Sequence, residues 1–116
     1  MAALDTVEDY INDARVLLQD TVDAPYRYSD ASLLQALNLG IYEARRLRPD
    51  LFLDQFDDLP NFDAVDSTEF EFDQQFRPAF PYYIAARAQM GDEEQTEDAR
   101  AREFMVRFNN ILVGLG

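Results

Sequence analysis

The sequence predicts an all-α fold, a four-helix bundle with an extended acidic loop or short β-arm between its second and third helices. Apolar residues recur at spacings of three and four over four separate stretches, as in helices that bury one side. Residues 51–76 lack this period, and they hold eight acidic residues with no lysine or arginine between positions 54 and 73. At 116 residues, the chain is expected to form a single helical domain, 1–116, with 51–76 as its insertion.

The first helix is expected to begin at Asp5 or Thr6, because either side chain can accept hydrogen bonds from the free amides of a helix start. Glu8 and Asp9 follow in the first turn, where the helix dipole favours negative charge. The apolar residues at helical spacing predict a buried side made of Val7, Tyr10, Ile11, Ala14, Leu17 and Leu18.

The second helix is predicted from about Asp30 to Leu47, after a Ser29 cap. Pro49 ends it, because the residue before a proline is disfavoured in helical geometry. Its inner side is predicted to hold Leu33, Leu34, Leu37, Ile41, Tyr42 and Ala44, with Asn38 among them. Gly40 costs up to about 1 kcal/mol relative to alanine in a helix, which indicates either close approach of another helix or simple tolerance of that cost.

The third helix is predicted to begin near Arg77 or Pro78, so that Pro81 stays in the first turn, and to end at Gly91. A fourth helix is predicted after a Thr96 cap. Its inner stripe is predicted to comprise Ala101, Phe104, Phe108, Ile111, Leu112 and Leu115.

The acidic segment between the second and third helices is the first candidate for function. Its carboxylates are Asp54, Asp57, Asp58, Asp63, Asp66, Glu69, Glu71 and Asp73. Residues 68–72 alternate polar and apolar, which is typical of a short strand or extended arm. Clustered carboxylates can bind calcium, but the ligand spacing and central glycine of a calcium loop are absent, so a solvated loop is favoured.

Composition narrows the function classes. The chain has no cysteine and no histidine, which excludes the usual zinc sites, disulfides, thiol nucleophiles and near-neutral general bases. The net charge of −13 disfavours direct binding to nucleic acid. We therefore expect no catalytic site, no metal and no cofactor, with a metal-dependent carboxylate enzyme as the last alternative. No apolar stretch reaches the roughly 20 residues of a membrane span, and the acidic start, 1–9, indicates no signal peptide.

Every cation of the chain is an arginine, a side chain suited to fixed ion pairs, although drift in a GC-rich genome explains the same bias. Arg45, Arg46 and Arg48 cluster at the end of the second helix, where cations complement the helix dipole. Arg87 lies among aromatic and small residues, so it is expected to be buried with a carboxylate partner in its own or a neighbouring protomer.

Three stretches, taken in order, resemble the head-to-tail adaptors of tailed bacteriophages, also called neck, connector or head completion proteins. The first reads DARVLLQD at 13–20, RYSD at 27–30 and LLQALN at 33–38, and the second reads EARRLRPD at 43–50. The third reads FRPA at 76–79, YIAARA at 83–88, DEE at 92–94 and ARA at 99–101, and it ends at Phe108. These words encode helix caps and packing, and their shared order carries the resemblance.

The resemblance implies a structural virion protein that forms a ring of about twelve copies beneath the portal. Its partners would be the portal protein on one side and a tail or nozzle protein on the other, in a neck assembled in the host cytoplasm. Double-stranded DNA would pass through the channel without specific binding. Many relatives have a longer insertion that carries strands, so a separate β-domain is not expected here.

The resemblance also suggests roles for the charged residues. The acidic segment would line the channel or reach along a neighbouring subunit instead of covering its own core, with an outer solvated loop as the competing interpretation. Arg45, Arg46, Arg48 and Arg87 would form inter-subunit or portal ion pairs. The alternative from another class is a small acidic DNA mimic or host-protein inhibitor, whose carboxylates are spaced like phosphates.

Overall fold

The computed structural model describes residues 4–18, 20, 28–55, 61–70, 74–90 and 98–114. Among these residues, four α-helices and two short 3-10 helices follow one another. They are α1 (Val7–Leu18), α2 (Asp30–Leu47), η1 (Pro49–Gln55), η2 (Gln74–Phe76), α3 (Ala79–Met90) and α4 (Asp98–Val113). The predicted all-α class is confirmed, and the described ranges contain no strand.

Local signals explain where α1 and α2 begin and end. Thr6 caps α1, because its Oγ1 accepts from the Asp9 amide at 3.2 Å while Asp9 Oδ2 accepts from the Thr6 amide at 3.0 Å. Ser29 caps α2 through its hydroxyl, which accepts from the Ser32 amide. At the other end of α2, the Arg48 amide donates to the carbonyl of Ala44, and Pro49 starts η1.

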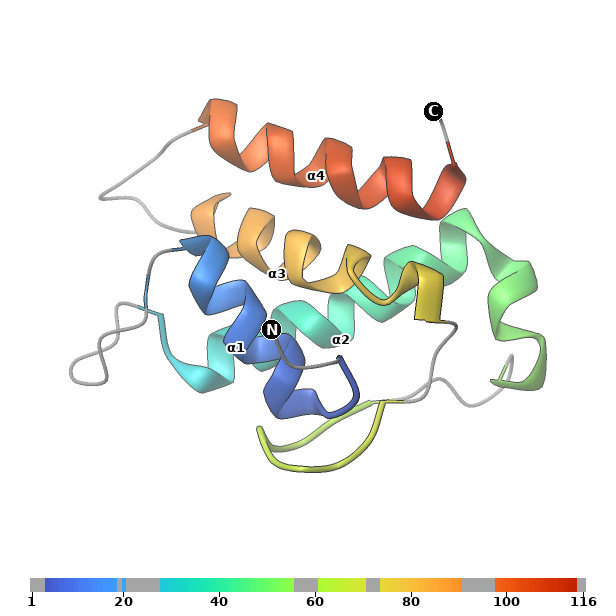
Figure 1. Ribbon diagram of the computed structural model, residues 1–116, viewed down its shortest axis with the longest axis horizontal. Coiled ribbons are helices and arrows are strands. Elements are labelled where there is room, and N and C mark those ends of the chain that lie inside the picture. The colour runs from blue at the N-terminus through green and yellow to red at the C-terminus, as the bar shows by residue number, and fades with distance from the viewer. Residues whose placement is uncertain are drawn as a thin grey trace.

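Helix α3 is the centre of the molecule and packs against α1, α2 and α4 (Figure 1). Helix α3 is buried on nearly every side. It consists mainly of alanine and aromatic residues, whereas the other helices carry charged residues on their outer sides. The helix begins at Ala79, slightly later than predicted, and Pro81 sits in its first turn as expected. Gly91, predicted to end this helix, and Thr96, predicted to cap the start of the fourth helix, lie outside the described residues.

Close approach of α2 to α3 explains Gly40. A β-carbon at Gly40 would lie 2.9 Å from Cδ1 of Tyr83, closer than real contacts allow. The first of the two explanations from the sequence is therefore confirmed. Tyr83 in turn packs on Phe108 of α4, with ring centroids 4.8 Å apart, so one aromatic side chain joins three helices.

The core comprises most of the predicted stripes, and Phe52 and Phe70 of the insertion 51–76 add to it. The fully buried large side chains are Tyr10, Phe52, Phe70, Phe80, Phe108, Ile11, Leu33, Leu37, Ile41, Ile84, Leu112 and Val7. Tyr42 was predicted on the inner side of α2, but this prediction is wrong, because Tyr42 is 54% exposed. It lies next to Ile41 in sequence, and one helical step of about 100° turns it away from α3. Leu115 lies outside the described residues.

Candidate functional site

Three of the predicted acidic residues, Asp63, Asp66 and Glu69, lie in the described stretch 61–70, and all three are exposed. Asp54 belongs to η1, without a described side chain. The other four, Asp57, Asp58, Glu71 and Asp73, fall outside the described residues. The structure therefore describes the middle part of the acidic segment.

Apolar side chains of this stretch pack on the core of their own chain. Phe70 is 1% exposed, and its ring lies 5.2 Å from that of Tyr10 and 5.1 Å from that of Phe80. Phe62 packs on Phe70 at 5.5 Å, and its backbone exchanges two hydrogen bonds of 2.9 Å with the side-chain amide of Asn38. The expected detachment from its own core is thus wrong for 61–70, because buried aromatic surface outweighs the polar pattern.

Backbone hydrogen bonds fasten the same stretch to the start of α1. The amides of Val7 and Glu8 donate to the carbonyls of Thr68 and Asp66 at 2.9 and 3.0 Å, so two free amides of the helix start are satisfied. The Phe70 amide donates to the backbone carbonyl of Asp5 at 2.9 Å. Within the described part of the predicted strand, residues 68–70 make one isolated bridge, between Thr6 and Glu69, and residues 71–72 lie outside the described residues.

This fastening creates what we call the acidic face, the exposed residues Asp5, Glu8, Asp63, Asp66 and Glu69. Arg77 reaches it from the turn before α3 and donates to Asp5 Oδ1 at 2.8 Å. Hydrogen bonds from the Thr68 side chain and amide lower the pKa of Asp66. The face therefore presents five exposed carboxylates on backbone that is fastened to the start of α1.

The three arginines predicted at the end of α2 have different surroundings: Arg48 binds other elements of the protomer, and Arg46 is exposed to solvent. Arg48 donates to both carboxylate oxygens of Asp50, at 3.0 and 2.9 Å, and to the Leu112 carbonyl of α4. Its guanidinium also lies 5.2 Å from the ring centroid of Phe76, so Arg48 joins three elements within the protomer. Arg46 is exposed and pairs with Glu43 one turn earlier, and Arg45 is half-buried.

Arg87 differs from its prediction, because its side chain is exposed on α3. Within the described part of the chain it has no carboxylate within ion-pair distance. Arg87 follows the buried Ala85 and Ala86, and it lies on the side of α3 that α1, α2 and α4 do not cover. The burial argument for a partner therefore does not apply to Arg87.

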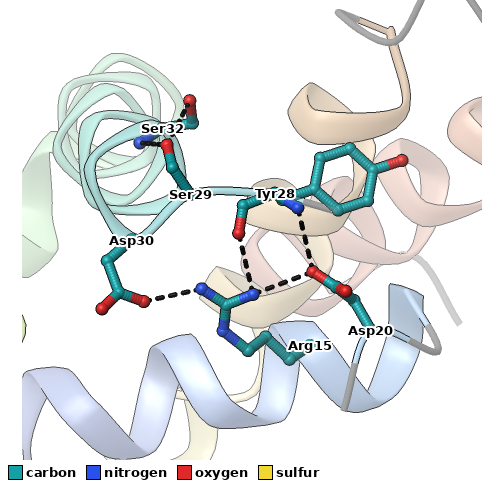
Figure 2. A network of polar contacts seen from close by, with 6 residues as sticks. All are labelled: Arg15, Asp20, Tyr28, Ser29, Asp30 and Ser32. Atoms are coloured by element: carbon teal, nitrogen blue, oxygen red, sulfur yellow. Dashed lines mark hydrogen bonds and ion pairs between the residues drawn. The ribbon is translucent and has the colours of Figure 1, made fainter. Parts of the chain in front are cut away.

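Among the described residues, the buried cation is Arg15, which was not a predicted site residue. Its side chain is 4% exposed, and Nη1 donates to Asp20 Oδ2 at 2.8 Å and to the Tyr28 carbonyl at 2.9 Å. Nη2 donates to Asp30 Oδ1 at 2.6 Å, in the first turn of α2 (Figure 2). Arg15 thus holds the end of α1 to the start of α2.

Asp20 completes this network from the acceptor side. Its Oδ2 also accepts from the Tyr28 amide at 3.0 Å, and its own amide donates to the Arg15 carbonyl at 2.8 Å. Arg15 falls four residues after Ile11 and eight after Val7, so helical spacing alone places it on the buried side. That position was the available signal, since a cation on a buried stripe requires a nearby carboxylate.

The Arg15 and Arg48 contacts hold elements of the protomer together, and the acidic face offers exposed charges for binding. Among the described residues, no group of three or more acidic, histidine or cysteine side chains is placed to hold a metal ion. None of the described helices is long and apolar enough to cross a membrane. Comparison of the chain with models of protein families, with curated proteins and with solved structures finds no match.

Proposed function

We propose that this chain is a structural protein of the bacteriophage neck, a head-to-tail adaptor that forms a ring beneath the portal and bridges it to tail components. The observation that carries the proposal is the shared order of the sequence words between residues 13 and 108. Two of those words contain the Arg15, Asp20 and Asp30 side chains that connect α1 to α2. The words thus belong to the scaffold that every protomer of such a ring would need.

The acidic segment, whose residues Asp63, Asp66 and Glu69 lie on the acidic face, supports a role at the DNA channel. Eight acidic residues per chain between positions 54 and 73 give about 96 carboxylates in a ring of about twelve copies. Basic residues in the same place would bind the duplex by releasing counterions, whereas carboxylates repel its phosphates. A channel lined in this way lets DNA move through without sticking.

The exposed arginines supply cations for the other contacts of the ring. Arg46 and Arg87 project from the C-terminal halves of α2 and α3, and both are accessible to an acidic partner. We assign these two side chains, with Arg45, to ion pairs with the portal. Arg48 contributes indirectly, by fixing the end of α2 against α4.

Co-purification with the portal protein of the same genome, followed by imaging of the complex, tests this function. A collar of about twelve copies under the portal is the expected result. Failure to bind the portal, with the chain folded, would reject the adaptor role. For the channel, the triple change Asp63→Asn, Asp66→Asn and Glu69→Gln should slow genome ejection from assembled particles. The control Glu103→Gln removes an exposed charge of α4, away from the acidic face, and should leave ejection unchanged.

A small acidic DNA mimic or host-protein inhibitor is the second candidate, and the same acidic face favours it. Such a protein would bind a DNA-binding partner as a monomer or dimer, and DNA would compete for that partner. The native mass of the complex separates the two functions, because a mimic would form a small complex and ignore the portal. A metal-dependent enzyme would instead show thermal stabilisation by a divalent cation.

A further inference from the structure

Helix α4 has two different sides. One side carries Phe104, Phe108 and Leu112 into the core against α3. The opposite side carries Val106 and Val113, which are 53% and 45% exposed although both are apolar. Arg102 precedes Val106 by four residues and is exposed on the same side. We call these three residues the outer stripe of α4.

The outer stripe stands out because of its charge. In a chain with a net charge of −13, residues 99–114 contain three arginines and one glutamate. Arg107 pairs with Glu103 at 3.0 Å, and Arg100 donates to the Leu17 carbonyl. Arg102 is exposed on the outer stripe, so this stripe is a local surface of positive charge and exposed valine.

A complementary stripe lies on α1. Its outward residues are Glu8, Asn12 and Val16, at successive spacings of four, and Val16 is 63% exposed. Glu8 belongs to the acidic face, so carboxylates surround the N-terminal end of this stripe and valine marks its C-terminal end. The outer stripe of α4 has the same order, a charged residue first and valines after it, with the opposite sign.

The two stripes belong to different parts of the surface. Helix α4 forms one edge of the molecule in Figure 1, and the N-terminal end of α1 lies with residues 61–70 at the opposite edge. A contact between them therefore joins two copies head to tail, and each copy keeps one free stripe for the next. Contacts of this type close into rings when the rotation between copies permits it.

We infer that the outer stripe of α4 packs along the α1 stripe of a second copy, with Arg102 beside Glu8 at the edge of the acidic face. Val106 and Val113 then cover Asn12 and Val16 of that copy, which removes apolar surface from water on both sides. Arg102 sets the direction and register of the contact, because reversing either helix would place valine against carboxylates. The inference builds on the proposed function by naming the contact that joins neighbours in the ring.

Disulfide trapping tests this contact cleanly, because the chain has no cysteine of its own. One variant carries Val106→Cys and another Asn12→Cys, and the two are mixed at high protein concentration under mild oxidation. We expect a cross-linked heterodimer, and a ladder of multimers from the doubly substituted chain. A mixture of Val106→Cys with Gln35→Cys is the matched control, since Gln35 is exposed on α2.

Charge reversal tests the ionic part. Arg102→Glu in the Val106→Cys chain should lower the heterodimer yield about threefold or more. The double change Ala31→Glu and Gln35→Glu lowers the net charge equally but lies at exposed positions of α2, so it should leave the yield unchanged. An equal effect of both changes would mean that total charge alone controls association, and the inference would fail.

Two further outcomes would overturn the inference. One is a heterodimer yield no higher than that of the Gln35 control. The other is efficient dimer formation by Val106→Cys alone, which would mean that α4 packs on α4. Portal co-purification of the same variants separates the two proposals. Lost trapping with retained portal binding rejects only this contact, and trapping without portal binding rejects only the adaptor function.

Discussion

At the scale of single residues, Arg15 shows how a buried ion pair acts as a structural connection. Replacing it with alanine removes the ion pair with Asp20, which is 9% exposed, and releases the start of α2. We expect Arg15→Ala to lower the free energy of unfolding by about 3 kcal/mol, because breaking a buried ion pair is costly.

Urea denaturation followed by circular dichroism measures this change in the free energy of unfolding. Arg46→Ala is the matched control, since Arg46 also pairs with a carboxylate but is largely exposed. It should change stability far less. Equal losses from both variants would contradict the role given to the Arg15 network.

Two aspartates of α1, one turn apart, should titrate differently. Hydrogen bonds from the Thr6 and Asp5 amides lower the pKa of Asp9, with burial acting against them. Burial and the nearby Asp9 charge raise the pKa of Asp13. Carboxyl NMR signals should therefore show Asp9 losing its charge at lower pH than Asp13, and the reverse order would refute this description of the helix start.

The sign of the effect on stability follows from these directions. The lowered pKa of Asp9 contributes stability above its unfolded value of about 3.9, and this contribution is lost as pH falls through the folded pKa. The raised pKa of Asp13 acts in the opposite sense, because protonation relieves its burial. Asp9→Asn should therefore weaken the acid dependence of unfolding, whereas Asp13→Asn should strengthen it.

At the scale of helices, the contact between α2 and α3 depends on Gly40. Alanine is favoured over glycine within a helix by about 1 kcal/mol, but its β-carbon would meet the Tyr83 ring at 2.9 Å. Overpacking should win, and we expect Gly40→Ala to destabilise the protein by about 1 to 2 kcal/mol. Thermal unfolding of Gly40→Ala, Tyr83→Leu and the double variant measures the coupling, and additive losses would argue against the clash.

Helix α4 is predicted to contribute to the core through Phe108, which is fully buried against Tyr83. Phe108→Ala should cost about 3 to 5 kcal/mol in the free energy of unfolding. Denaturant unfolding checks this value. Unchanged stability combined with loss of portal binding would instead make that side of α4 an interface.

The helices were predictable because their signals are local. Ser29 and Pro49 bound α2 within a few residues of its ends, and the sequence alone located both. Residues 61–70 were less predictable, because their partners are the amides of Val7 and Glu8, about sixty positions earlier. The alternation at 68–72 predicted a short strand or extended arm, but no local pattern shows that Phe70 packs inward against Tyr10 and Phe80.

The sequence predicted which charged residues are candidates for function, but it predicted their positions in the structure less well. Exposure of Asp63, Asp66 and Glu69 agrees with the solvated character expected of an acidic segment. Arg87 was expected to be buried because its sequence neighbours are apolar. It is exposed, because it lies on the side of α3 that the other helices leave uncovered. Sequence spacing cannot reveal which side a central helix leaves uncovered, since that depends on how three other helices pack around it.

At the scale of the whole molecule, net charge controls association. A charge of −13 per chain opposes contact between copies, and the complementary stripes on α1 and α4 cover only a small area. We expect the isolated protein to be mainly monomeric at micromolar concentration and moderate salt, until a portal template brings copies together. Sedimentation velocity measures this, and a stable closed ring without portal would show that templating is unnecessary.

The hydrogen bonds from Val7 and Glu8 to the carbonyls of Thr68 and Asp66 also bear on the order of synthesis. The ribosome completes α1 long before it adds residues 66 and 68. Until then the first turn of α1 lacks these two acceptors, and the ring of Tyr10 lacks Phe70 beside it. An isolated helix of twelve residues is marginal in water. Helix α1 is therefore made before residues 66–70 and is completed only after they are added.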